Sequence, residues 1–220
     1  MTKQTKIAIT SILFLLVAIT DVYAVITETK SLEIEIIFKP LLMTTLVIVY
    51  LVSVKKPNFW LISALFFSFW GDVFLLDEVN YFVFGLGSFL IAHIMYIKMT
   101  SQLLKKPSIN KILKAAIIFI ALFGGVLFLI IDNLGEMLLP VIVYGVAISA
   151  FGTSALLNYQ QEKSTENTWL LLGAILFIAS DSLIALNNFY TPKKLFVIAI
   201  IVLYVVSQYL IVKAMIAKKQ

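Results

Sequence analysis

The sequence contains no cysteine, no arginine and a single histidine, His93, among its 220 residues. Without cysteine, the chain has no disulfide scaffold, no thiolate nucleophile and no cysteine-ligated zinc. One histidine cannot supply the two or three imidazole ligands of common catalytic zinc sites. Only 13% of the residues are charged, whereas charged residues make up about 25% of an ordinary globular protein. The sequence therefore predicts no metal and no cofactor.

Long apolar runs take the place of charge. Hydrophobic residues make up 61% of the chain and the mean hydropathy is +1.03. A soluble domain of this length cannot bury so much apolar surface, and lipid-exposed backbone must satisfy its own hydrogen bonds. The predicted fold class is all-α, a polytopic integral membrane helix bundle forming one transmembrane domain over residues 1–220. Runs of about 20 residues can span a bilayer, and eight are predicted to do so: Ile7–Ile26, Ile36–Val54, Phe59–Leu76, Tyr81–Leu104, Ile112–Ile131, Met137–Asn158, Thr168–Leu186 and Leu195–Ala217.

Lysines fall on alternate connections, which is typical of loops on the cytoplasmic side. The lysine-bearing side carries Lys3, Lys6, Lys55, Lys56, Lys105, Lys106, Lys111, Lys163, Lys218 and Lys219. The other side carries Glu28, Glu33, Glu35, Asp77, Glu78, Asp132 and Glu136, with Lys30, Lys193 and Lys194 as exceptions. We interpret the net charge of +5 as this orientation signal and not as nucleic-acid binding. Both termini are predicted in the cytoplasm, in a bacterial inner membrane.

The first run also allows a second interpretation. Lysines followed by an apolar stretch and Val22-Tyr23-Ala24 are compatible with a cleavable signal peptide. Cleavage there would leave seven spans.

Two segments resemble each other. Residues 64–72 and 173–181 both place a small residue and then an aspartate in the outer half of a predicted helix. Pro40 is expected to open the second span and Pro140 lies in the first turn of the sixth, where proline is tolerated. The second and third spans therefore resemble the sixth and seventh, which predicts a parallel 4+4 repeat. Transporters often contain such repeats.

Ionisable side chains inside a span are costly and indicate function. Asp72 and Asp181 lie on outward-running spans at matching depth, and we expect one polar cavity around them. The other candidates for that cavity are Lys39, Ser68, His93, Tyr96, Tyr144, Ser180, Tyr204 and Gln208. Asp21, near a helix end, is expected to be solvated or to cap the helix.

Helical spacing gives these residues shared faces. Ser68 and Asp72 are four residues apart, as are Tyr204 and Gln208. A carboxyl group supported by a hydroxyl and facing a Tyr/Gln surface suits acid–base chemistry. Structural alternatives stay open: the aspartates can pair across helices, Lys39 can extend to the interface, and His93 can be a hydrogen-bonded packing residue.

Six motifs, in order, resemble the YhhN family of membrane proteins, which includes the lysoplasmalogenases. They are Lys39-Pro40-Leu41, Phe67–Leu76, Gly85-x-x-x-Phe89-x-x-x-His93-x-x-Tyr96, Pro140-x-x-x-Tyr144, Gly173-Ala174-x-x-Phe177-x-x-Ser180-Asp181-Ser182 and Tyr204-x-x-x-Gln208. Trp70 and Gly145 stand where the family usually has an aliphatic residue and alanine. The first span matches by hydrophobicity alone, so Asp21 gains no support.

The resemblance implies a lipid hydrolase that cleaves the vinyl ether of a lysoplasmalogen, with a lysophospholipid substrate and surrounding membrane lipids. From that chemistry we expect Asp72 and Asp181 to form the acid–base pair, with either of them as the proton donor. His93, Tyr144, Tyr204 and Gln208 would orient them or a water, and Lys39 would pair with the substrate phosphate. The alternatives are a transporter or flippase with an intramembrane aspartate pair, a metal-dependent lipid hydrolase, and a purely structural membrane protein.

Overall fold

The structure, a computed structural model, describes the backbone of residues 3–27 and 32–218 and the side chains of residues 4–27 and 36–218. The orientation residues Glu28, Lys30 and Lys219, and the side chains of Lys3, Glu33 and Glu35, lie outside the described residues.

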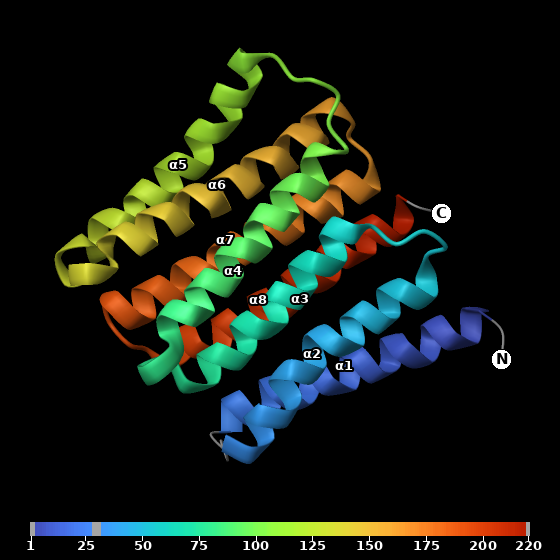
Figure 1. Cartoon of the computed structure of the whole chain (residues 1–220), viewed down its shortest axis with the longest axis horizontal. Helices are drawn as coiled ribbons and strands as arrows, with labels where there is room; N and C mark the ends of the chain where they lie inside the picture. Colours follow the sequence, from blue (N-terminus) through green and yellow to red (C-terminus); the bar gives the residue numbers. More distant parts are fainter. Residues whose placement is uncertain (1–2, 28–31, 219–220) are drawn as a thin grey trace. The chain divides into compact units, whose positions relative to one another are not determined.

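The described chain is helical throughout and contains no strand (Figure 1). The α-helices are α1 (Lys3–Thr27), α2 (Leu32–Ser53), α3 (Phe59–Phe74), α4 (Glu78–Ser101), α5 (Ile109–Ile130), α6 (Leu138–Gln161), α7 (Thr165–Phe189) and α8 (Lys194–Ala217). Short 3₁₀ turns lie between them: η1 (Leu75–Asp77), η2 (Ile131–Asn133) and η3 (Gly135–Met137). The all-α prediction is confirmed for the described residues.

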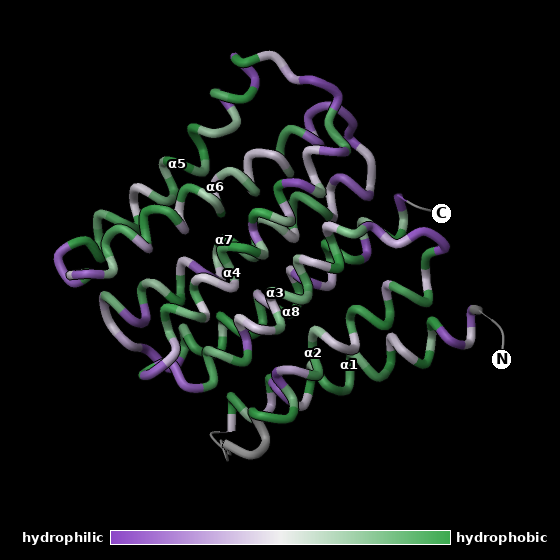
Figure 2. The backbone as a smooth tube through the Cα atoms, in the orientation of Figure 1, coloured by the Kyte–Doolittle hydropathy of each residue, from purple (hydrophilic) through white to green (hydrophobic). Residues whose placement is uncertain are grey.

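The helices are apolar on their outer faces. Leu16 and Ile19 on α1 and Ile117 on α5 are about 60% exposed. Hydrophilic residues gather at the connections and chain ends, and hydrophobic residues cover the helices between them (Figure 2). Such helices require hydrocarbon as solvent, so the protein is an integral membrane protein.

Seven apolar helical runs in the described residues are long enough to cross a membrane. One of them, Phe59–Ser101, is 43 residues long and contains α3, η1 and α4. The chain reverses direction at η1 (Figure 1). A Cβ on Gly71 of α3 would lie 2.5 Å from the Phe89 ring of α4, so the two helices lie side by side at that point. Seven runs do not confirm the eight predicted spans, although the longest run contains two α-helices.

The chain forms two compact units, one of residues 1–95 with 215–220 and one of residues 96–214. In the first unit, α1 packs on α2 and α2 packs on α3 around Phe14, Leu46 and Leu65. The N–H of Asn58 donates to the hydroxyl of Tyr50 at 2.9 Å and fastens the α2–α3 connection. The Asn58 side chain in turn accepts from the N–H of Leu61 and caps α3.

In the second unit, α5, α6 and α7 pack against one another. A buried polar network joins the end of α4 to α6. The hydroxyls of Thr100 and Ser154 are 2.6 Å apart. The side-chain amide of Asn158 donates to the backbone carbonyl oxygens of both residues. The end of α4 is thereby fixed within this unit.

Two local expectations are wrong. Pro40 does not open α2, because the helix begins earlier, at Leu32, and contains the proline in its interior. Asp21 is neither solvated nor at a cap, because α1 continues to Thr27 and the Asp21 side chain is 1% exposed.

The resemblance between the third and seventh helices extends to their burial. The buried residues Leu61, Ala64, Leu65, Ser68 and Gly71 of α3 have buried counterparts in α7, namely Leu170, Gly173, Ala174, Phe177 and Ser180. The spacing along the chain is constant and also aligns Asp72 with Asp181. At the same spacing, Asn58-x-Trp60-Leu61 matches Asn167-x-Trp169-Leu170. The two helices therefore share both a sequence motif and a buried face.

Candidate functional site

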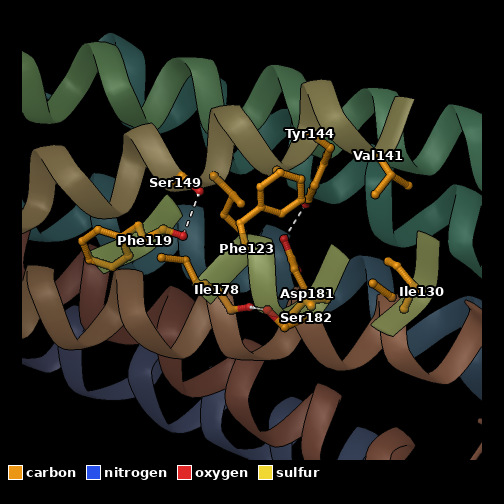
Figure 3. Close-up of a pocket in the computed structure, with 13 residues that line it drawn as sticks. Phe119, Phe123, Ile130, Val141, Tyr144, Ser149, Ile178, Asp181 and Ser182 are labelled. Atoms are coloured by element: carbon orange, nitrogen blue, oxygen red, sulfur yellow. Dashed lines mark hydrogen bonds between the residues drawn. The ribbon is translucent and has the colours of Figure 1, made fainter. Parts of the chain in front are cut away.

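The clearest polar contact between helices joins Tyr144 of α6 to Asp181 of α7. The hydroxyl of Tyr144 donates a hydrogen bond to Oδ2 of Asp181 (Figure 3). Tyr144 is 9% exposed and Asp181 is half-buried. A hydrogen bond from a phenol restricts the rotation of the carboxyl group, so Asp181 is held in a defined direction.

This pair borders a small cavity of about 50 Å³ between α5, α6 and α7. A cavity needs roughly 10–15 Å³ and two to four polar partners to hold a water molecule. Besides the pair, the hydroxyls of Ser149 and Ser182 line the cavity. They donate to the carbonyl oxygens of Phe119 and Ile178, at 3.4 and 2.7 Å. The cavity is therefore large enough for a water molecule and has four residues with side-chain oxygens in its lining.

Local sequence explains how the helices deliver these groups. Pro140 lies in the first turn of α6, as expected, and Tyr144 follows one turn later. Gly145 leaves room for the ring of Phe123 from α5, because a Cβ on Gly145 would lie 2.0 Å from that ring. The ring lies beside Tyr144 (Figure 3). Close approach of α5 and α6 at the pair therefore depends on a glycine.

Three other candidates, Tyr96, Gln208 and Tyr204, form a packed cluster in the same unit. The hydroxyl of Tyr96 donates to Oε1 of Gln208 at 2.5 Å. The Tyr96 ring stacks on Phe151 and meets Phe177 edge-on, and Phe177 meets the Tyr204 ring edge-on. Tyr96 and Gln208 are completely buried. Both residues therefore contribute to helix packing, and their supporting role at the site stays a prediction.

Ser180 also has a structural contact. It is completely buried, and its hydroxyl donates to the carbonyl oxygen of Ile200 at 3.0 Å, which joins α7 to α8. Because Ser180 directly precedes Asp181, this bond fixes α7 next to the carboxyl group.

The remaining candidates belong to the first unit. Ser68 and Asp72 lie one turn apart on α3, 0% and 8% exposed. His93 of α4 is completely buried, and Lys39 of α2 is half-buried. Asp72 and Asp181 thus lie in different units, and their joint action stays a proposal.

Sequence reasoning missed Phe123, Ser149 and the packing role of Gly145. The signal available was a glycine directly after a candidate tyrosine in a helix, which marks a close approach. Phe123 carried no signal, because it is one of 17 phenylalanines in apolar runs. Among the side chains that the structure describes, no three His, Asp or Glu residues form a metal-binding group.

Comparisons with known proteins found similar curated proteins and a matching family model. It is 32% identical to proteins named lysoplasmalogenase from Mycobacterium bovis and from Mycobacterium tuberculosis. Each match covers 163 residues, which is 72% of this chain and 60% of the relative. The chain thus spans about 60% of the length of these curated relatives. No solved structure matches it. The YhhN family model matches residues 34–215, most of the chain, and the protein therefore belongs to the YhhN family.

Proposed function

We propose that this protein hydrolyses the vinyl ether bond of a lysoplasmalogen and releases a fatty aldehyde and a glycerophospho-alcohol. The observation that carries the proposal is the hydrogen bond between Tyr144 and Asp181 beside a water-sized cavity in membrane-spanning helices. Family membership and the relatives named lysoplasmalogenase support the same reaction.

The reaction needs an acid, a base and one water. Protonation of the vinyl carbon β to the ether oxygen gives an oxocarbenium ion, as in glycoside cleavage by a carboxyl pair. Water adds to the cation and gives a hemiacetal, which collapses to the aldehyde and the alcohol. The reaction consumes one vinyl ether and one water molecule, and it produces one aldehyde and one alcohol.

In this proposal Asp181 accepts a proton from the attacking water and later returns it to the departing alcohol oxygen. The cavity beside Asp181 has room for that water. Tyr144 is a positioning residue, because it acts by holding the carboxyl group of Asp181.

We propose Asp72 as the acid that protonates carbon. Asp72 is buried on α3, one turn from Ser68, and its position in the helix aligns with that of the half-buried Asp181 on the related α7. The hemiacetal hydroxyl proton then restores Asp72. Lys39 remains the proposed partner of the substrate phosphate and His93 a proposed orienting residue.

The topology belongs to the same proposal. The reversal between α3 and α4 supports two spans in the 43-residue run, and therefore eight in all. The shared buried face of α3 and α7 supports the parallel 4+4 repeat. Lysines on alternate connections support cytoplasmic termini in a bacterial inner membrane.

The orientation can be tested with an impermeant thiol reagent. Because the chain lacks cysteine, a single cysteine can be placed at Lys106 or at Glu136. We expect the reagent to label the two single-cysteine variants from opposite sides of the membrane.

The reaction is tested by supplying purified protein with a single-chain vinyl ether lipid, its saturated ether analogue and its ester analogue. We expect aldehyde from the first and no product from the others. Fatty acid from the ester would identify an esterase. Accumulation of unchanged lipid across liposome membranes would identify the transporter alternative.

A further inference from the structure

A second, larger cavity lies next to the Tyr144–Asp181 site in the second unit. It is a groove of about 510 Å³ between α5 and α6, and Ser101 at the end of α4 also lines it. Ligand pockets usually measure about 300–1,000 Å³. Phe123 and Ser149 line both the groove and the small cavity at Asp181, so the groove ends where the candidate site begins.

The groove suits an aliphatic chain. Ile112, Ala116 and Ile120 line it from α5, and Val146, Ala150 and Leu157 line it from α6. Four residues with hydroxyl groups also line it: the exposed Ser101 at the end of α4, and three whose hydroxyls are bonded within the protein. Ser149 donates to Phe119, Thr153 to Ser149 and Ser154 to Phe151, in each case to the backbone carbonyl oxygen. A hydrocarbon lying there leaves none of these three donors without an acceptor.

The groove also has the direction of a lipid chain. Along α5 it extends from Ile112 to Phe123, which is about 16 Å at about 1.5 Å rise per residue. Because the helices span the membrane, a chain lying in the groove runs along the membrane normal. A chain whose polar end lies at Phe123 and the Asp181 cavity would have its methyl end toward the α4–α5 connection.

We propose that the α5–α6 groove binds the single aliphatic chain of the substrate, with Phe123, seated on Gly145, forming the boundary between chain and reacting bond. The inference rests on the proposed function for the identity of the reacting bond. The groove itself can be tested without hydrolysis. The surrounding lipid tails are as apolar as the groove, so an aliphatic chain gains no hydrophobic free energy by entering it. The groove can therefore select a lipid only by the shape of its chain.

The test uses a saturated single-chain ether lysolipid that cannot be cleaved and carries a photoreactive group in its chain. Purified full-length protein is cross-linked in nanodiscs and the labelled peptides are identified by mass spectrometry. We expect labelling on α5 and α6 that excess unlabelled lysolipid suppresses and excess two-chain phospholipid does not. Suppression by both lipids equally, or labelling on other helices, would overturn the proposal.

Groove-filling variants make the test specific. Ala116→Phe and Ala150→Phe fill the groove from its two sides and should lose the α5 and α6 label. Ile117→Phe is the matched control, because Ile117 is 64% exposed and does not line the groove. Persistent label in a folded groove-filling variant would contradict the proposal, and the second variant keeps the test valid if one fails to fold.

A hydrolysis readout separates this inference from the proposed function. In wild-type protein we expect the rate to depend on chain length, with an optimum that shifts to shorter chains in Ala116→Phe. Aldehyde release with an unshifted optimum would overturn the groove and leave the reaction standing. Specific cross-linking without aldehyde would leave the groove and overturn the reaction.

Discussion

Tyr144 and Asp181 are joined by a hydrogen bond between α6 and α7, and the ring of Phe123 from α5 lies beside them. Three helices therefore meet at one carboxyl group, next to a cavity that can hold water. In the proposed reaction Asp181 is the reacting group, and Tyr144 and Phe123 hold it in place.

Removing the Tyr144 hydroxyl should weaken catalysis without weakening substrate binding. In Tyr144→Phe the ring remains but Asp181 can rotate, and misplacement of a reacting group can cost about a hundredfold. We expect kcat to fall roughly 10- to 100-fold at unchanged KM, measured by aldehyde release. Tyr190→Phe, at an exposed tyrosine, is the control.

The double variant Tyr144→Phe/Asp181→Asn sharpens this. Because Tyr144 acts through Asp181, the double variant should be no slower than Asp181→Asn alone. Multiplied losses would show that Tyr144 has a separate role.

Gly145→Ala should force Phe123 away from α6, because the new Cβ would overlap its ring. Overpacking of a core costs about 1–3 kcal/mol, so we expect lower stability to denaturation in detergent and reduced turnover. Phe123→Leu in the same chain should restore part of both, since the obstacle is a side chain. Gly124→Ala, where a Cβ meets nothing within 4 Å, should leave stability unchanged or raise it. Normal stability in Gly145→Ala would contradict the packing.

Gly173→Ala should also destabilise the protein, and a second substitution at a neighbouring side chain should not restore its stability. A Cβ there would lie 2.8 Å from Cγ1 of Ile211, and also 3.0 Å from the carbonyl oxygen of Ser207 and 3.2 Å from the backbone nitrogen of Ile211. Backbone atoms cannot move aside as a side chain can, so Ile211→Ala in the same chain should not restore the unfolding midpoint. Full recovery in that double variant would show that α7 and α8 are less closely packed.

Tyr96→Phe should have a small effect. It removes the hydrogen bond to Gln208 and keeps the ring contacts with Phe151 and Phe177. Hydrogen bonds between membrane helices average about 0.6 kcal/mol, so stability should fall by roughly that amount and turnover should persist. Tyr96→Ala should cost about 3–5 kcal/mol through loss of the ring. If the Tyr96→Phe protein folds but has no turnover, Tyr96 takes part in the reaction.

Hydropathy predicted the all-α membrane class, because a membrane helix must be apolar over its whole length. It could not locate helix ends, as Pro40 shows: nothing in the sequence indicated that α2 begins at Leu32. Asp21 was misjudged for a related reason, since burial depends on the neighbouring helix and not on distance from a terminus.

The sequence also singled out Tyr144 and Asp181, because polar groups inside a span stand out against an apolar background. The contact between them, and the packing of Tyr96 on Gln208, depend on how the helices rotate about their axes. Apolar residues around every helix leave that rotation undefined. For the same reason nothing in the sequence pointed to Phe123.

The most direct test of the account is aldehyde release from a single-chain vinyl ether lipid by purified wild-type protein and by Asp181→Asn, at equal folded amounts. Acid–base groups contribute about 10²- to 10⁴-fold, and we expect a loss in that range for Asp181→Asn. Asp72→Asn, measured in parallel, should also lose activity if it supplies the proton. Aldehyde release by Asp181→Asn at the wild-type rate would contradict the account.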